Sequence, residues 1–251
     1  MRAARSIAGP GLRAFAYDAV GGELLERARA WLARGPEAEE EVLKEGRVWR
    51  HGPYAVKRFD PELGVRLHLR PSHARRNAEL HFALAPIPTP RPYLVLEDRT
   101  RGSLLVAEYV EGEFLHRLWN GGGPAVAAFP GFMAEMHKHG VYHGDFHLGN
   151  ALWNGGAWVL LDLEGVRAPR RTFDRRTLVL EQWARVHLGL RGARGLRDAF
   201  EAYLKQRRMR WNAARVWPEI VQRSRRLALA RGADPSYVER DGQDPAPWSS
   251  S

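Results

Sequence analysis

Three polar side chains near the middle of the sequence have residue types and a spacing that suit phosphate chemistry. Asn150 follows Asp145 by five positions, and Asp162 follows Asn150 by twelve. A carboxylate can orient a hydroxyl group and take its proton, whereas carboxylate and amide oxygens are the ligands that Mg²⁺ prefers. These side chains therefore predict metal-assisted transfer of a phosphoryl group to a hydroxyl group.

The first two of these residues lie in one eight-residue segment, His143-Gly144-Asp145-Phe146-His147-Leu148-Gly149-Asn150. Its spacing matches the kinase catalytic loop, H-R-D-L-x-x-x-N, in which the aspartate is the catalytic base and the asparagine binds a magnesium ion. An isolated aspartate in a loop is more often a turn former or a helix cap. A zinc site at His143 and His147 is not expected, because no glutamate follows His143 as a zinc-protease helix requires.

Two predicted elements hold residues 143–150 at both ends. Large apolar residues recur at helical spacing before the segment, at positions 129, 132, 133 and 136, which predicts a buried helix that ends near Gly140. After the segment, Asn154-Gly155-Gly156 separates two short apolar runs and predicts a tight β-hairpin. Such a hairpin returns the chain to the loop, so we expect Asp162 beside Asn150 as a second metal ligand.

An upstream group of residues predicts the grip on the nucleotide. Residues 54–57 fit the strand pattern V-A-I-K, whose lysine holds the nucleotide phosphates, and Lys57 is that lysine here. A helix is predicted over residues 72–84, with Ser72 as its N-cap. Glu79 is the only acid in this helix and is the predicted ion-pair partner of Lys57.

The remaining nucleotide contacts are predicted from turns and backbone. Gly46 marks the turn that would lie over the nucleotide, and no G-x-G-x-x-G pattern accompanies it. The segment Glu108-Tyr109-Val110 is the predicted hinge, where backbone groups of Glu108 and Val110 would bind adenine. The predicted cofactors are therefore ATP and Mg²⁺.

The order of predicted elements indicates an α+β, protein-kinase-like bilobal fold. Short strands are expected at residues 41–43, 47–50, 54–59, 93–97 and 104–109, and a proline-rich connector at residues 86–92 forbids helix. Helices are expected at residues 175–188, 196–205 and 219–230. We predict four regions: an extension with an amphipathic helix (1–40, helix 23–34), a β-rich N-lobe with one main helix (41–110), a mostly helical C-lobe (111–232) and a flexible tail (233–251).

At this point the sequence resembles the lipopolysaccharide kinase family, which phosphorylates the inner-core sugars Kdo or heptose, within the protein-kinase-like superfamily. The resemblance spans about half of the chain and is carried by Val56-Lys57-Arg58-Phe59, Ile87-Pro88-Thr89-Pro90, the segment 105–112, His137 and the segment 143–150. It implies a lipid-linked sugar as acceptor, on the cytoplasmic face of the inner membrane. Gly144 replaces the arginine of H-R-D, and no A-P-E follows Asp162, so gating by a phosphorylated loop is not expected.

Charge and composition bound the partners and the compartment. The chain of 251 residues has a formal net charge of +10, which suits an anionic glycolipid or sugar acceptor and peripheral contact with an anionic membrane. The absence of cysteine excludes disulfides and thiolate chemistry. No apolar run of membrane-spanning length occurs, so a cytoplasmic location is expected. Nucleic acid is not expected as a partner, because no RNA- or DNA-binding motif accompanies the basic charge.

Three alternative functions remain open at the level of sequence. The first is a small-molecule kinase of the aminoglycoside or choline type, or an atypical protein kinase, since these enzymes use nearly the same loop and fold does not decide function. An acidic acceptor pocket would favour aminoglycosides, and a basic one would favour anionic glycans. The other two are a non-catalytic, pseudokinase-like binding protein and a basic nucleic-acid binder.

Overall fold

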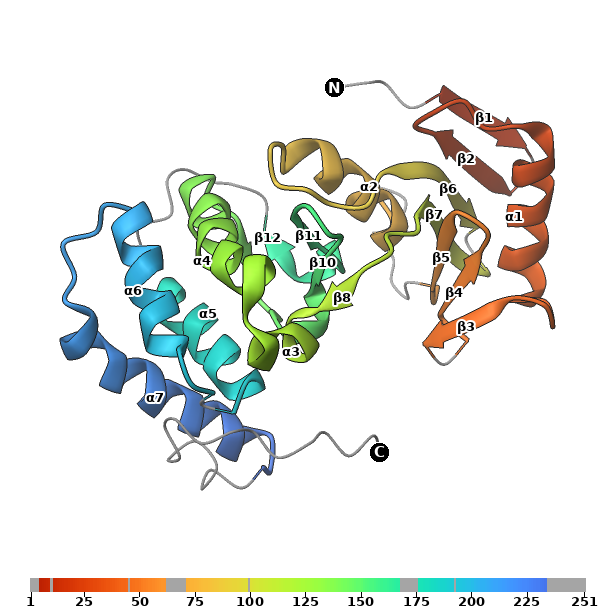
Figure 1. Cartoon of the computed structure of the whole chain (residues 1–251). Helices are drawn as coiled ribbons and strands as arrows, with labels where there is room; N and C mark the ends of the chain where they lie inside the picture. Colours follow the sequence, from red (N-terminus) through yellow and green to blue (C-terminus); the bar gives the residue numbers. More distant parts are fainter. Residues whose placement is uncertain are drawn as a thin grey trace. The chain divides into compact units, whose positions relative to one another are not determined.

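The computed structural model describes residues 5–9, 11–44, 46–61, 71–98, 100–167, 176–191 and 193–233 (Figure 1). The chain divides into two compact units, Met1–Ala85 with Thr89–Glu111 and Pro86–Pro88 with Gly112–Ser251. The first unit is built around a β-sheet and the second is mostly helical. The expected α+β class, with a sheet-rich N-terminal part and a helical C-terminal part, is confirmed.

The N-terminal unit contains one seven-stranded antiparallel sheet with the strand order β1-β2-β6-β7-β5-β4-β3. The predicted strands from position 41 onward are present, with ends that differ by at most two residues. Two further strands precede them in the chain. The strands are β1 (Arg5–Gly9), β2 (Leu12–Ala16), β3 (Glu41–Lys44), β4 (Val48–His51), β5 (Tyr54–Phe59), β6 (Pro92–Asp98) and β7 (Gly102–Glu108).

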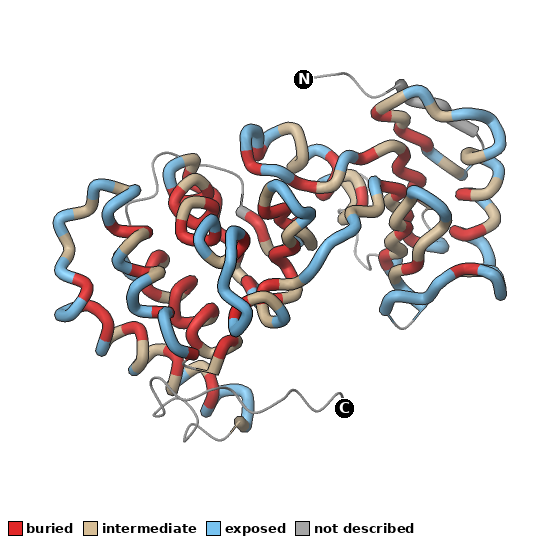
Figure 2. The backbone as a smooth tube through the Cα atoms, viewed as in Figure 1, coloured by how far each residue is buried: buried red, intermediate tan, exposed pale blue. Residues whose placement is uncertain are grey.

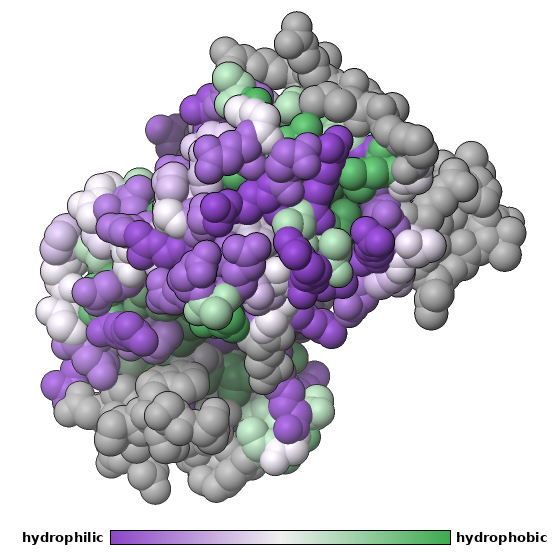
Figure 3. All heavy atoms as spheres, turned by 90° about the vertical axis from the view of Figure 1, so that its right-hand side faces the viewer, coloured by the Kyte–Doolittle hydropathy of each residue, from purple (hydrophilic) through white to green (hydrophobic). Residues whose placement is uncertain are grey.

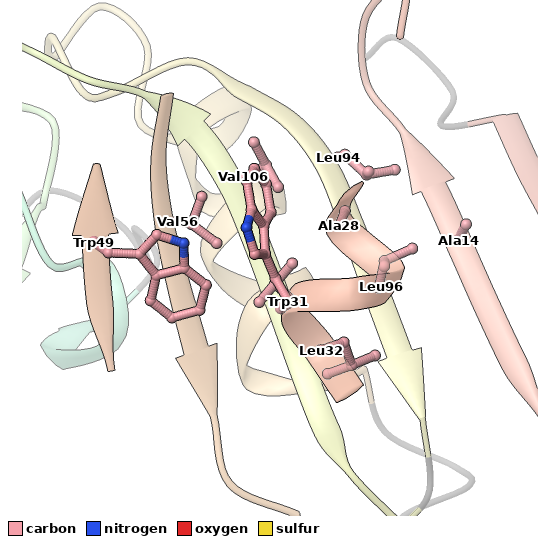
Figure 4. Close-up of a cluster of buried hydrophobic side chains, with 10 residues drawn as sticks. Ala14, Ala28, Trp31, Leu32, Trp49, Val56, Leu94, Leu96 and Val106 are labelled. Carbon is pink, nitrogen blue, oxygen red and sulfur yellow. The ribbon is translucent and has the colours of Figure 1, made fainter. Parts of the chain in front are cut away.

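Helix α1 (Gly22–Arg34) covers one face of this sheet. Its residues Ala28, Trp31 and Leu32 are buried, and the Trp31 ring meets Trp49 of β4 edge to face at 6.2 Å (Figure 4). The predicted helix over residues 23–34 is confirmed, and its apolar side packs on the sheet. The face of the molecule on the α1 side is predominantly hydrophilic (Figure 3).

The region predicted as an extension, residues 1–40, contributes to the sheet unit. Strand β2 pairs with β6 through residues 12–16, and Ala14 of β2 belongs to the same buried cluster as Trp31. The sequence shows no clear periodicity over residues 1–22, because β2 is only five residues long and its adjacent residues Ala14 and Phe15 are both buried. The N-terminal sheet is therefore wider than the one predicted from residues 41–110.

A buried carboxylate fixes α1 to the strands that follow it. The Nε1 of Trp31 donates to Oε1 of Glu40 at 2.6 Å, and the backbone N–H of Glu37 donates to Oε2 at 2.8 Å. The Nδ1 of His51 lies 3.3 Å from Oε1 of Glu40. Because the Glu40 side chain is only 1% exposed, these contacts replace the water that a charged carboxylate would otherwise need.

Helix α2 (His73–Ala83) covers the opposite face of the sheet. The predicted N-cap is confirmed, since Oγ of Ser72 accepts a hydrogen bond from the backbone N–H of Arg75 at 3.1 Å. A second buried cluster lies under this helix and contains Phe15, Tyr17, Phe59, Ala74, Ala78 and Val95. The helix is followed by the proline-rich connector, which has no helix or strand from Pro88 to Arg91.

The described residues of the C-terminal unit form five helices and several short strands. Helices α4 and α5 are buried along much of their length (Figure 2), and the predicted apolar stripe at positions 129, 132, 133 and 136 is buried in α4. The helices are α3 (Leu115–Leu118), α4 (Gly123–Lys138), α5 (Arg176–Gly189), α6 (Leu196–Gln206) and α7 (Ala213–Ala230). The strands are β8 (Glu113–Phe114), β9 (Tyr142–His143), β10 (Ala151–Trp153), β11 (Trp158–Leu160) and β12 (Val166–Arg167), with 3-10 turns η2 (Trp119–Gly121), η3 (Leu148–Asn150) and η4 (Leu163–Gly165).

The last helix, α7, begins six residues before the predicted start at position 219. Asn212 caps it by accepting from the backbone N–H of Arg215, and Pro218 lies inside the helix. The helix continues through the proline because Val216, Trp217 and Ile220 are buried against the unit, which outweighs one lost backbone bond. The predicted tail lies outside the described residues, apart from Ala233. None of the described helices is long and apolar enough to cross a membrane.

Candidate active site

The predicted catalytic loop connects β9 to β10 in the C-terminal unit. Asp145 is exposed on this loop, whereas Asn150 ends the turn η3 and is 2% exposed. The Nδ2 of Asn150 donates to the backbone carbonyl of Asp145 at 3.0 Å, which closes the loop on itself. The loop therefore presents the Asp145 carboxylate to solvent while its backbone is held from inside.

The predicted hairpin returns the chain to this loop. Strands β10 and β11 pair from Ala151↔Leu160 to Trp153↔Trp158, and Oδ1 of Asn154 accepts from two backbone N–H groups of the turn. Beyond β11, the backbone N–H of Leu161 donates to the carbonyl of Asn150 at 2.8 Å. Asp162 therefore directly follows a residue that bonds to the loop, and the hairpin prediction is confirmed.

His143 joins the catalytic loop to Asp162. Its Nε2 lies 2.7 Å from the backbone carbonyl of Asp162, and because a carbonyl only accepts, Nε2 carries the proton. The contact of 3.3 Å between Nε2 and Nδ2 of Asn150 is then a close approach of two donors, and the Asn150 amide donates to Asp145 instead. Burial lowers the pKa of His143, which favours this neutral ring.

Gly165 permits this close packing. A Cβ atom on Gly165 would lie 2.8 Å from Cε1 and 2.9 Å from Nδ1 of His143. The carbonyl of Gly165 also accepts from the backbone N–H of Gly144 at 2.9 Å, and β12 pairs with β9 through Val166↔His143. Residues 162–166 are therefore packed directly on residues 142–145.

Asp162 has a backbone conformation that few non-glycine residues adopt. Its φ of 52° and ψ of 70° lie in the left-handed region, which aspartate tolerates better than most residues. Non-glycine residues persist in this region where the surrounding structure over-determines them, and such residues cluster at functional sites. The bond from His143 to the Asp162 carbonyl and the buried Leu163 supply that constraint here.

The arrangement fits a magnesium site with two protein ligands. Because Nδ2 of Asn150 donates to the Asp145 carbonyl, Oδ1 of Asn150 is the amide atom suited to a metal, and the Asp162 carboxylate stays the predicted second ligand. Among the described residues, no group of three or more His, Cys, Asp or Glu side chains could hold a metal ion. Mg²⁺ commonly takes one or two carboxylates and completes its octahedron with phosphate oxygens and water, so this set suits Mg²⁺ bound with a nucleotide.

Two arginines lie near the Asp145 carboxylate. Oδ1 of Asp145 is 3.6 Å from Nη1 of Arg185 in α5 and 3.6 Å from Nη2 of Arg231, which follows α7. The aspartate is 70% exposed, so solvent screens both interactions. Neither arginine was predicted from sequence, since they follow Asp145 by 40 and 86 positions and belong to no motif.

The remaining predicted residues belong to the N-terminal unit. Lys57 lies on β5 and its Nζ is 5.1 Å from the centroid of the Phe59 ring, on the face covered by α2. The carboxylate of Glu79 is about half exposed, and its Oε1 accepts from Nε of Arg75, one helical turn earlier, at 2.8 Å. Arg75 is thus the observed partner of Glu79, and an ion pair between Lys57 and Glu79 stays a prediction.

The predicted turn and hinge residues are also in this unit. Gly46 has a φ of 64° in the turn between β3 and β4, a conformation that glycine adopts freely. The backbone N–H groups of Glu108 and Tyr109 donate to the carbonyls of Arg91 and Pro53 at 2.8 Å each. No backbone bond between described residues uses the N–H of Val110. The adenine contacts of Glu108 and Val110 stay a prediction.

No protein-family model and no curated protein matches the chain. Among solved structures, the chain is similar to the kinase PK-1 of the Cydia pomonella granulovirus, with 16% sequence identity and a TM-score of 0.37. The match covers 59% of this chain and 58% of the viral kinase, so the chain spans less than two thirds of that protein. We therefore infer function from the geometry of residues 143–165.

Proposed function

We propose that this protein is an ATP- and Mg²⁺-dependent kinase that transfers the γ-phosphoryl group of ATP to a sugar hydroxyl of a lipopolysaccharide-type glycolipid core. The observation that supports phosphoryl transfer most directly is the bond from His143 to the Asp162 carbonyl. Through it, an exposed carboxylate, an amide oxygen and a second carboxylate are held on one packed segment. This is the minimum that positioning and charge neutralisation require in phosphoryl transfer.

Each residue has a distinct part in the proposed reaction. Asp145 would accept a hydrogen bond from the acceptor hydroxyl and take its proton as the oxygen attacks phosphorus. Asn150 and Asp162 would hold Mg²⁺, which supplies positive charge against the phosphoryl oxygens. Lys57 would bind the nucleotide phosphates, with Glu79 orienting it, while Gly46 and the hinge residues Glu108 and Val110 would contact the nucleotide.

The reaction balances with the groups named. A bond forms between the acceptor oxygen and the γ-phosphorus, and the bond from the γ-phosphorus to the β,γ-bridging oxygen breaks. The proton of the hydroxyl passes to the Asp145 carboxylate, and ADP leaves with the electron pair of the broken bond. Most of the rate gain would come from holding the two oxygens in line with phosphorus.

The acceptor and the location of the protein are the more specific part of the proposal. The net charge of +10 supports an anionic acceptor and peripheral contact with an anionic membrane surface, as at the cytoplasmic face of an inner membrane. A small-molecule kinase and a non-catalytic binding protein are the alternatives that the test below must exclude.

The test is an acceptor screen with the purified chain. The protein is incubated with Mg·ATP and, separately, with core glycolipids, aminoglycosides, choline and proteins, and mass spectrometry then locates any added phosphate. We expect phosphate on a core sugar. In Asp145→Asn the turnover should fall by about 10²–10⁴-fold while ATP binding is retained. Phosphate on an aminoglycoside or protein instead, or near-normal activity of Asp145→Asn, would overturn the proposal.

A further inference from the structure

Arg185 and Arg231 approach the same oxygen of Asp145 without closing on it. Both guanidinium nitrogens are 3.6 Å from Oδ1, which is beyond the 2.7–3.2 Å of an N–H···O hydrogen bond. Other arginines of this protein reach their carboxylates at 2.8 Å and 3.0 Å, in the pairs Arg13–Glu97 and Arg50–Glu111. The open geometry leaves donors on both arginines and lone pairs on Asp145 for a ligand.

The surroundings of Arg185 hold it in place. Arg185 is 18% exposed and lies near the hydroxyl of Tyr142, the residue that pairs with Arg167 in the strands beside the catalytic loop. That hydroxyl donates to Oε2 of Glu181 at 3.3 Å, and Oε1 of Glu181 lies 3.8 Å from Nη1 of Arg223 in α7. Helices α5 and α7 therefore fix one arginine beside Asp145, while Arg231, 52% exposed, lies at the solvent edge.

The charges at this place do not cancel. Arg185 and Arg231 carry two positive charges, and Asp145 between them carries one negative charge. A positive surplus beside a hydroxyl-binding carboxylate suits a ligand that brings its own negative charge, and paired arginines match the oxygens of a phosphate or carboxylate.

We propose that Arg185 and Arg231 bind an oxyanion group of the acceptor and thereby hold its hydroxyl against Asp145. This inference rests on the proposed function and adds a requirement for the acceptor: the anionic group must lie close to the phosphorylated hydroxyl. The acceptor hydroxyl oxygen would lie about 2.7 Å from Oδ1 of Asp145, and the anion oxygen about 2.9 Å from a guanidinium nitrogen. Because Oδ1 and that nitrogen are 3.6 Å apart, the two acceptor oxygens can be at most about 9 Å apart.

That upper limit places the charge on the same sugar ring or on a directly linked neighbour. A charge several sugars away from the hydroxyl does not reach the arginines. A polycationic acceptor such as an aminoglycoside is disfavoured, because it would bring like charge to Arg185 and Arg231. Under this proposal, Arg185 and Arg231 are the residues that separate anionic glycans from aminoglycosides.

Arg231 is the better residue for a test, because its side chain is 52% exposed whereas that of Arg185 is 18% exposed. In Arg231→Gln we expect the KM for an anionic acceptor to rise about tenfold or more, since one charge-assisted contact is lost. The KM for ATP should change less than twofold. Arg231→Lys should lie between the wild type and Arg231→Gln, because lysine keeps the charge and loses the planar fork.

The matched control is Arg226→Gln, which removes the same charge from an exposed position of α7. A second control is the same acceptor with its anionic group methylated. Wild type and Arg231→Gln should both use this acceptor poorly, with nearly equal kcat/KM. A rise in the KM for ATP instead would assign the arginines to the nucleotide and overturn the proposal. Equal KM values for Arg231→Gln and Arg226→Gln would overturn it as well.

A binding measurement decides the anion site even where no acceptor is phosphorylated. Inorganic phosphate is added to the full chain without ATP, and the thermal unfolding midpoint is recorded for wild type, Arg231→Gln, Arg185→Gln and Arg226→Gln. Stabilisation of wild type and Arg226→Gln, with little in the other two variants, is the expected result. Equal stabilisation of all four proteins, or of none, would refute the anion site. If the expected pattern of stabilisation is found but the protein phosphorylates no acceptor, only the proposed kinase function is refuted.

Discussion

The Nε2 atom of His143 donates a hydrogen bond of 2.7 Å to the backbone carbonyl of Asp162. The two residues are 19 positions apart, and the β10–β11 hairpin lies between them. This bond therefore holds the Asp162 backbone, at a φ of 52°, beside the loop that carries Asp145 and Asn150. It is therefore the contact on which the geometry of the candidate site depends.

Replacing His143 should damage catalysis more than folding. In His143→Leu the Asp162 carbonyl loses its donor, and we expect turnover to fall by about 10–100-fold, from a loss of about 1–3 kcal/mol in positioning. The thermal unfolding midpoint should fall by only a few degrees, because leucine fills much of the ring volume. Steady-state kinetics and thermal unfolding check this, and unchanged turnover in a folded variant would contradict it.

A methyl group at Gly165 should have a similar effect by a different cause. In Gly165→Ala the new Cβ would lie 2.8 Å from the His143 ring, so the ring or the 162–166 segment must move. We expect a loss of at least tenfold in turnover, since misplacing catalytic groups by about 1 Å can cost 100-fold. Gly156→Ala is the control, because its Cβ would meet only Oδ1 of Asn154, at 3.9 Å. Equal activity of the two variants would count against the packing described.

The buried Glu40 should contribute strongly to the stability of the N-terminal unit. Glu40→Ala leaves the Nε1 of Trp31 and the N–H of Glu37 without their acceptor, and we expect a loss of about 2–4 kcal/mol in the free energy of unfolding. Glu39→Ala, at the exposed neighbouring position, should change it by less than about 0.5 kcal/mol. Denaturant unfolding followed by tryptophan fluorescence measures both, and similar values for the two variants would contradict the role of Glu40.

Stability should depend on pH through His137, which is fully buried in α4. Burial lowers its pKa from 6.5 to about 4, and its Nδ1 and Nε2 contact the Tyr203 hydroxyl and Oε1 of Gln182. Between these pH values the unfolded chain binds a proton that the folded chain does not. The free energy of unfolding therefore falls as the pH drops from 6.5 towards 4, and His137 adds nothing further below that.

His137→Gln should reduce this pH dependence. We expect the loss of unfolding free energy between pH 6.5 and pH 4.5 to be smaller by about 2 kcal/mol than in the wild type. Tyr203→Phe removes a hydrogen bond but keeps the histidine, so it should lower stability at every pH and retain the slope. Denaturant unfolding at a series of pH values checks both variants, and an unchanged slope in His137→Gln would exclude His137 as the cause.

Local patterns predicted much of the C-terminal site. The spacing from Asp145 to Asn150 and the Asn154-Gly155-Gly156 turn were enough to place Asp162 beside the loop, because a hairpin returns the chain to its start. The role of Gly165 was not predictable. Glycine is required at this position because the His143 ring, which is distant in sequence, leaves no room for a Cβ atom. Arg185 and Arg231 were missed for the same reason: helix packing, not spacing, brings them to Asp145.

The N-terminal region was less predictable because its signals are weak and its contacts distant. Strand β2 is five residues long and pairs with β6 about 80 positions later, so no local pattern indicates it. The amphipathic pattern of α1 was clear, but the sequence did not say whether its apolar side met a membrane or a sheet. Trp49, Val56 and Leu96 supply the buried surface that decides this.

The proposed function requires that one nucleotide contact both Lys57 and Asp162. An ATP analogue with an acyl group on its terminal phosphate tests this, because it acylates a lysine amine that touches the phosphates. Peptide mapping by mass spectrometry should find Lys57 labelled in the presence of Mg²⁺. Excess ATP should suppress this labelling, and the labelling should be strongly reduced in Asp162→Asn. Labelling of other lysines with Lys57 unmodified, or equal labelling of Lys57 in wild type and Asp162→Asn, would contradict the claim.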